Sequence, residues 1–351
     1  MKTTALNMKN KTVKRAFGLL LFLLLLVALA AGYVYHAVHS AAFAIDQPVA
    51  VYVDEQKDYS RLLSQLQSEA HLKNREVFDR LAQQMKYPSN MKTGKYEIRP
   101  GLSYIAAIRM LQSGRQTPIQ LTFNNIRLKN DLAERIGRQM MFAPGDLLNH
   151  LNDSAVAASL GLDTATILTL FIPNTYEIYW NTSVGLFLER MKKEHDRFWT
   201  QERLAKAQAL HLSPAEVAIL ASIVEEETAS RREFPIVAGI YLNRLKKGML
   251  LQADPTVKFA AGDVTLKRIL NVHLQVESPY NTYRYRGLPP GPIRIPSIAA
   301  IDSVLNYSRH AYLYMCAKED FSGTHSFSVT LAEHNRNARR YREALNRLHI
   351  R

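Results

Sequence analysis

The chain has 351 residues, a formal net charge of +14 and a single cysteine, Cys316. One cysteine excludes an intrachain disulfide, and it also excludes the paired-cysteine motifs of metal and redox sites. The excess of Lys and Arg would suit nucleic acid, but no nucleic-acid motif accompanies it. We therefore expect no nucleic-acid partner, no metal and no cofactor.

An almost wholly apolar segment, residues 16–36, follows a basic stretch at residues 1–15. As a helix it would be about 30 Å long, which is enough for one bilayer crossing. The first charge after it is Asp46, so the positive-inside rule places the N-terminus in the cytoplasm and the rest of the chain outside the cytoplasmic (inner) membrane. A cleaved signal peptide is the alternative, because residues 28–30 resemble a cleavage site. We favour an uncleaved single-pass anchor, since the apolar run continues past that site.

Residues 46–122 predict a small module. Strand alternation at Val51–Val53 and Tyr96–Ile98 encloses two segments with helical spacing, one near Leu62–Leu66 and one near Asn74–Met85. A strand, two helices and a returning strand make a β-α-α-β unit. The pattern leaves two roles open, a spacer and a glycan-binding module.

Residues 123–351 predict a larger mixed domain, which makes the fold class α+β. Its loops are rich in Tyr, Asn, Gln and turn formers, for example at residues 171–176, 251–256, 278–283 and 287–292. Pro173 argues against a central strand in the first of these. Aromatic rings stack on the apolar faces of sugars and amides bond their hydroxyls, so such loops suit a glycan.

Three consecutive glutamates end a helix that is otherwise apolar. Ser213, Pro214 and Glu216 predict its start, as an N-cap, a first-turn proline and a capping-box partner. A helix that is apolar all round is buried, and a poorly solvated carboxyl has the raised pKa that a general acid needs. At about 100° per residue, Glu225 faces the smallest side chains of the helix, which leaves room for a ligand. Glu226 points elsewhere and Glu227 lies beside Leu220 and Ile223. The alternative is a solvated helix end.

Four runs of this domain resemble those of one family. They are SIVEEET at 222–228, LNRLKKGMLLQADPTV at 242–257, SPYNTYRYRGLPPGPI at 278–293 and GTHSFSVTLAEHN at 323–335. In order and spacing they are similar to the YceG-like (MltG-type) endolytic peptidoglycan transglycosylases, over about residues 46–351. This sequence differs from the family pattern at Leu168 and Thr169, where the family usually has Glu-Gly, and at Asn174, where the family usually has Asp.

The resemblance implies a LysM-like module at residues 46–122 and a catalytic domain at 123–351. It implies that the catalytic glutamate is Glu225. It also implies a set of substrate-binding residues, namely Gln252, Asp254, Asn281, Thr282, Tyr283 and His325.

The implied reaction needs only one carboxyl group. Protonated Glu225 would donate to the oxygen between N-acetylmuramic acid and N-acetylglucosamine in nascent glycan strands. The carboxylate would then take the proton of the muramyl C6 hydroxyl, which attacks C1 and leaves a 1,6-anhydro end. Glu227 and Asp254 are candidate second carboxylates, and one of them facing Glu225 would favour a hydrolytic muramidase. A non-catalytic wall-binding scaffold is the other alternative. Peptidoglycan strands, the membrane and peptidoglycan synthases are the expected partners.

Overall fold

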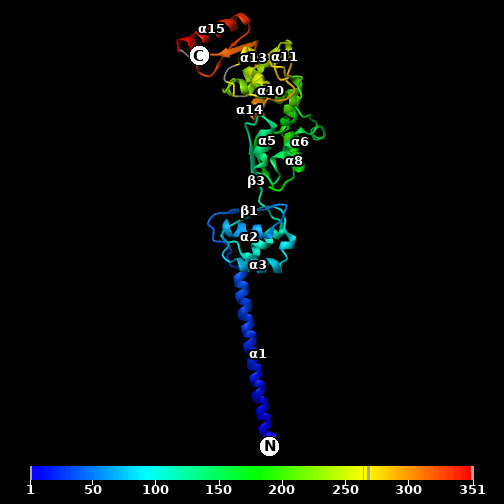
Figure 1. Ribbon diagram of the computed structural model, residues 1–351, viewed down its shortest axis with the longest axis vertical. Coiled ribbons are helices and arrows are strands. Elements are labelled where there is room, and N and C mark those ends of the chain that lie inside the picture. Colours follow the sequence, from blue (N-terminus) through cyan, green and yellow to red (C-terminus); the bar gives the residue numbers. More distant parts are fainter. Residues whose placement is uncertain (1, 264, 267–268, 349–351) are drawn as a thin grey trace. The chain divides into compact units, whose positions relative to one another are not determined.

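The computed structural model describes residues 2–263, 265–266 and 269–348. The fold is mixed α+β with one N-terminal apolar helix, which confirms the predicted fold class (Figure 1). Beyond that helix the chain forms two compact units. The first contains the residues up to 119 together with 178–181, and the second contains 120–177 and the residues from 182 onward.

Helix α1 (Lys2–His39) carries the apolar segment. Its part Phe17–His39 has 23 residues and a mean hydropathy of 2.6, and none of its most apolar window is buried. By length and composition this helix could cross a membrane. Its exposed leucines would cost free energy in water but not in lipid. The prediction of an N-terminal apolar helix is confirmed.

The first unit contains a two-stranded antiparallel sheet in which Val51 lies opposite Tyr96. Its elements after α1 are β1 (Val49–Val53), α2 (Tyr59–Ser68), α3 (Arg75–Gln84), the 3₁₀ helix η1 (Pro88–Asn90), β2 (Gly94–Ile98) and α4 (Tyr104–Ser113). The inward positions of both strands and the apolar faces of the helices form one core, with Leu66, Phe78 and Ile98 fully buried. The LysM-like assignment of this unit stays a prediction.

A short segment from later in the chain returns to this first unit. The Trp180 ring meets the Tyr52 ring edge-on at 4.9 Å. Asn181 Nδ2 donates to the carbonyl and the hydroxyl oxygens of Thr93 at 3.0 and 2.9 Å. No local pattern in the sequence predicts this return, because the partners are 88 residues apart.

The second unit begins with helices around one aromatic cluster. Its first elements are β3 (Ile119–Phe123), α5 (Lys129–Gly137), α6 (Pro144–Asn152), α7 (Ser154–Ser159), η2 (Ile167–Leu170), β4 (Asn174–Ile178), α8 (Val184–Phe198) and α9 (Gln201–Ala209). Strands β3 and β4 pair with each other, and Phe123 stacks on Tyr176 at 5.5 Å. Residues 171–176 were expected to be a loop, but a strand starts at Asn174. It follows Pro173 directly, so the proline itself stays outside the ladder.

The rest of the second unit is built around α10. The remaining elements are α10 (Pro214–Glu227), α11 (Phe234–Lys246), α12 (Asp254–Ala260), α13 (Asn271–Leu274), α14 (Ile298–Leu305), β5 (Tyr314–Ala317), β6 (His325–Ser328) and α15 (Leu331–Arg347). Helix α10 packs on α11 and α14, and residues 217–224 are all buried. Its capping box is present, since Ser213 Oγ accepts from the N–H of Glu216 and Glu216 accepts from that of Ser213. The predicted loop at 251–256 instead enters α12 at Asp254.

Candidate active site

The three glutamates at the end of α10 have different partners. They are consecutive residues of one helix, so their side chains leave it about 100° apart. Each is partly exposed, although the turn before them is buried. The three directions lead to three different environments, and these decide what each carboxyl group can do.

Glu225 is tied to the segment that leads into α14. Its Oε2 accepts from the N–H of Ser297 at 2.8 Å, and Arg294 Nε lies 3.6 Å away. The flank of small residues that it faces is not open. Ser222 is fully buried, and its Oγ accepts from the N–H of Ile293 at 3.1 Å. The room that the sequence argument assigned to a ligand on this flank is therefore occupied by residues 293–297 of the chain itself.

Glu226 is the centre of an ion-pair cluster. Arg127 Nη2 donates to both of its carboxylate oxygens at 2.8 and 2.7 Å, and Arg294 Nη1 donates at 2.6 Å. Arg294 also donates to Asn125 Oδ1 at 2.7 Å. The cluster thus joins the end of α10 to the segment after β3 and to the segment before α14. A cavity of about 120 Å³ adjoins it, lined by Arg127, Glu226, Pro255, Lys258, Phe259 and Ile293.

Glu227 has the environment of a protonated carboxyl. Burial raises its pKa to about 7, and the nearby negative charge of Asp254 acts in the same direction. The hydroxyl of Tyr241 donates to its Oε1 at 2.6 Å and, with the charges of Arg244 and Lys258, partly offsets the rise. A carboxyl that titrates near pH 7 and keeps a partly exposed side chain is able to give a proton and take one back.

Asp254 and Tyr283 form a pair close to Glu227. The Tyr283 hydroxyl donates to Asp254 Oδ1 at 2.6 Å. Burial and this carboxylate both raise the pKa of Tyr283, with Glu227 adding to the effect. Two of the predicted substrate residues therefore lie around Glu227. Gln252 lies on the same loop and is exposed, with its backbone N–H bonded to the carbonyl of Thr282 at 3.1 Å.

Asn281 and Thr282 are inside the protein rather than on its surface, and their contact with substrate stays a prediction. Both are at most 1% exposed. Asn281 Nδ2 donates to the carbonyls of Leu274 and Val276, and Thr282 Oγ1 accepts from the N–H of Ala253. Because their polar atoms satisfy buried backbone groups, these two residues hold the loop in shape.

His325 is held by a buried carboxylate. Its backbone N–H and its Nδ1 both donate to Glu233 at 2.8 Å, and the Thr228 hydroxyl donates to the same carboxylate. Burial would raise the pKa of Glu233, but these hydrogen bonds outweigh it and lower that pKa. His325 therefore lies on a hydrogen-bonded link to Thr228, the residue that follows Glu227 in the chain.

The sequence model of the YceG-like family matches residues 51–340. The chain belongs to the YceG-like family. Two curated relatives carry the name endolytic murein transglycosylase. The Bacillus subtilis protein is 28% identical over 72% of this chain and 74% of its own length. The Streptococcus pneumoniae D39 protein is 25% identical over 90% of this chain and 63% of its own.

A solved structure has the same fold. The crystal structure of a YceG-like protein from Listeria monocytogenes aligns with a TM-score of 0.56 and 25% identity, over 83% of this chain and 99% of that one. The family predicted from the four sequence runs is thereby confirmed.

Several residues of this YceG-like site were not found by sequence reasoning. They are Arg127, Glu233, Tyr241, Arg244 and Arg294. Charged and hydroxyl-bearing residues of this kind are common, and only their contacts in the folded site set them apart. The separations in sequence reach 99 residues for Arg127 and Glu226, so no local spacing could have signalled them.

Proposed function

We propose that the chain is a membrane-anchored endolytic lytic transglycosylase. It cleaves the bond between N-acetylmuramic acid and N-acetylglucosamine in nascent peptidoglycan strands and leaves 1,6-anhydro-N-acetylmuramic acid ends. The names of its relatives support the reaction class. The observation that carries the proposal is Glu227, a partly exposed carboxyl whose pKa is raised to about 7.

The choice of the catalytic glutamate rests on two different arguments. The resemblance assigns the role to Glu225, and the environment in the structure favours Glu227. Glu225 accepts a backbone hydrogen bond from Ser297 and lies near Arg294, so its carboxylate already has a structural task. Glu227 has the desolvation and the neighbouring negative charge that keep a carboxyl protonated. We therefore assign the proton transfers to Glu227 and keep Glu225 as the competing assignment.

The reaction proceeds with one carboxyl group in both steps. Protonated Glu227 donates its proton to the glycosidic oxygen while the bond from that oxygen to muramyl C1 breaks. The resulting carboxylate takes the proton of the C6 hydroxyl, whose oxygen bonds to C1 in the same sugar. No water is consumed, and Glu227 ends protonated again. The attacking C6 hydroxyl and C1 belong to the same sugar, so the reaction gains from their proximity.

Neighbouring residues support this chemistry in distinct ways. Tyr241 holds one oxygen of Glu227 and so orients the carboxyl group. Asp254 accepts a hydrogen bond from Tyr283, and its negative charge disfavours ionisation of the nearby Glu227. Gln252 and the exposed edge of Tyr283 are proposed to contact the sugar.

The helix Phe17–His39 is proposed to anchor the protein in the cytoplasmic membrane with residues 1–15 inside. Lys and Arg before the apolar run and none directly after it support this orientation. The residues that follow this helix then lie on the extracytoplasmic side, where peptidoglycan is found.

Mass spectrometry of the products tests the proposal against its alternatives. Digestion of purified glycan strands by the full chain in detergent should give muropeptides with anhydro ends. Reducing ends would mean hydrolysis, with Asp254 as the candidate second carboxylate. Absence of any cleavage, with strands retained on the protein, would mean a scaffold. Glu225→Gln and Glu227→Gln, assayed side by side, identify the glutamate.

A further inference from the structure

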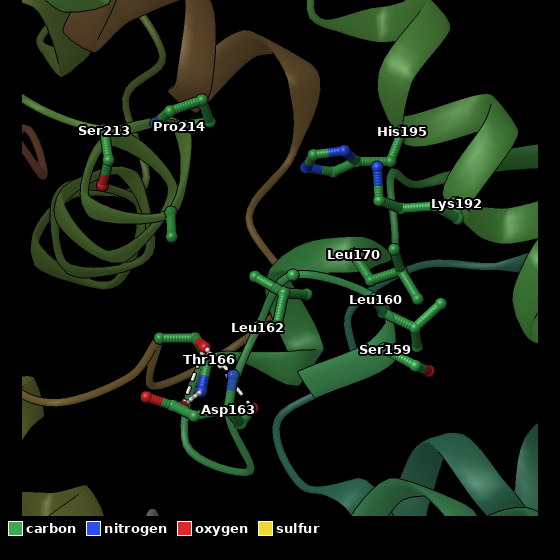
Figure 2. A pocket seen from close by; sticks show the side chains of 12 residues that line it. Ser159, Leu160, Leu162, Asp163, Thr166, Leu170, Lys192, His195, Ser213 and Pro214 are labelled. Atoms are coloured by element: carbon green, nitrogen blue, oxygen red, sulfur yellow. Dashed lines mark hydrogen bonds between the residues drawn. The ribbon is translucent and has the colours of Figure 1, made fainter. Parts of the chain in front are cut away.

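A second cavity lies at the start of α10, at the opposite end of the helix from the three glutamates. Its volume is about 640 Å³, within the usual range for a small-molecule site. The lining residues come from the segment around the end of α7, from η2, from α8 and from the start of α10. Figure 2 shows Lys192 and His195 on one side, with Ser213 and Pro214 facing them from α10.

The cavity combines an apolar floor with groups of both charges. Leu160, Leu162 and Leu170 contribute the apolar part, and Leu170 is only 1% exposed. Asp163 lies below them in Figure 2, on the loop that leads to Thr166. Lys192 brings the positive charge. A ligand with an apolar portion and charged groups of both signs would complement this lining.

Asp163 offers one free carboxylate oxygen. Its Oδ1 accepts from the N–H groups of Ala165 and Thr166 and from the Thr166 hydroxyl, at 2.8, 2.7 and 2.8 Å. Within the described residues its Oδ2 has no hydrogen-bond partner. The bonds from Thr166, with help from Ala165 and from the charge of Lys129, lower the pKa of Asp163, which stays ionised at neutral pH. The free oxygen is a ready acceptor for an ammonium group.

Lys192 offers a donor on the other side, and His195 offers an acceptor. Lys192 Nζ donates to both oxygens of Asp196 at 2.6 Å, which leaves its third N–H. His195 Nδ1 lies 3.2 Å from Asp196 Oδ1, and its Nε2 has no partner in the part of the chain that the structure describes. Burial lowers the pKa of His195 despite Asp196, so its ring is neutral at pH 7. Because a neutral ring directs its one N–H from Nδ1 to Asp196, its Nε2 is an acceptor for a ligand N–H, and only Lys192 is suited to meet a carboxylate.

We propose that this cavity binds a short peptide that carries both a free amine and a free carboxylate, the chemistry of a peptidoglycan stem peptide. Asp163 would take the amine, Lys192 the carboxylate, His195 Nε2 an amide N–H of the peptide, and the leucines the alkyl side chains. The inference rests on the proposed function, and it adds a specificity site to it. Helix α10 has 14 residues, so at about 1.5 Å per residue the cavity and Glu227 are roughly 20 Å apart.

The test compares peptide-bearing glycan strands with strands from which an amidase has removed the peptides. The full chain should cleave the first with the higher kcat/KM. Asp163→Asn keeps the turn at Thr166 but loses the charge, and Lys192→Met loses the ammonium group. In each variant the ratio of kcat/KM on the two strands should fall about tenfold, as for loss of one charged hydrogen bond.

Two matched variants control for altered surface charge and stability. Lys206 pairs with Glu202 four residues away at 2.7 Å and is 37% exposed, against 35% for Lys192. Asp153 accepts from two backbone N–H groups in the way that Asp163 does. Neither lines the cavity. Lys206→Met and Asp153→Asn should leave the ratio unchanged.

Calorimetry with a free synthetic peptide of the stem type gives a second, independent result. Binding to the unmodified chain that weakens about tenfold in Asp163→Asn supports the inference. Equal cleavage of both strands together with no heat of binding would overturn it and leave the proposed function intact. Cleavage of neither strand would overturn the proposed function, whereas peptide binding that is lost in Asp163→Asn would still support the cavity's ligand.

Discussion

Glu227→Gln is expected to increase the stability of the fold at alkaline pH while it abolishes activity. The native pKa of Glu227 is about 7, against an ordinary value of 4.5. Between these two values the folded protein binds more protons at this site than the unfolded chain does, so stability falls as pH rises through that window. At about 1.4 kcal/mol per pH unit the loss reaches about 3 kcal/mol above pH 7, as an upper bound for a partly exposed group.

Glutamine carries no charge to desolvate and still accepts the hydrogen bond from Tyr241. Urea unfolding at pH 5 and pH 8 should therefore show the variant close to the wild type at pH 5 and up to about 3 kcal/mol more stable at pH 8. Anhydromuropeptide formation should fall by about 10²–10⁴-fold, and kcat/KM of the wild type should decline above pH 7. Glu225→Gln is assayed in parallel as the comparison for activity.

Two results would refute the reasoning. A stability difference for Glu227→Gln that is the same at both pH values would mean that the native pKa is not raised. Full activity in Glu227→Gln with none in Glu225→Gln would return the catalytic role to the glutamate that the family resemblance selects.

Further predictions concern the surrounding residues and the anchor. Glu226→Gln should destabilise the fold by about 1–3 kcal/mol in thermal unfolding, since it weakens the clamp of two arginines, yet keep most activity per folded molecule. Gln252→Ala should lower turnover with stability within about 1 kcal/mol. Asn281→Ala should instead lower the free energy of unfolding by about 1–3 kcal/mol, because two buried carbonyls lose their donor. An unchanged melting temperature would contradict this. A reporter fused after residue 351 should be active only outside the cytoplasm, and soluble protein lacking residues 16–36 would indicate a signal peptide instead.

Local sequence determined the features that depend on neighbouring residues. The run at 16–36 predicts an apolar helix, because hydropathy and length are properties of the segment itself. The capping box of Ser213 and Glu216 fixes the start of α10 for the same reason. The four sequence runs also predicted the family correctly, because their order and spacing along the chain are properties of the sequence itself.

The surroundings of the three glutamates come from the tertiary structure alone. The side chains or backbone groups that bond the three carboxyl groups belong to Tyr241, Ser297 and Arg127, which are 14, 72 and 99 residues from their partners in the sequence. The sequence placed small residues beside Glu225, but it could not show that residues 293–297 cover them. Helical periodicity predicts the direction in which a side chain leaves the helix, but only the packed fold shows which residues surround it there.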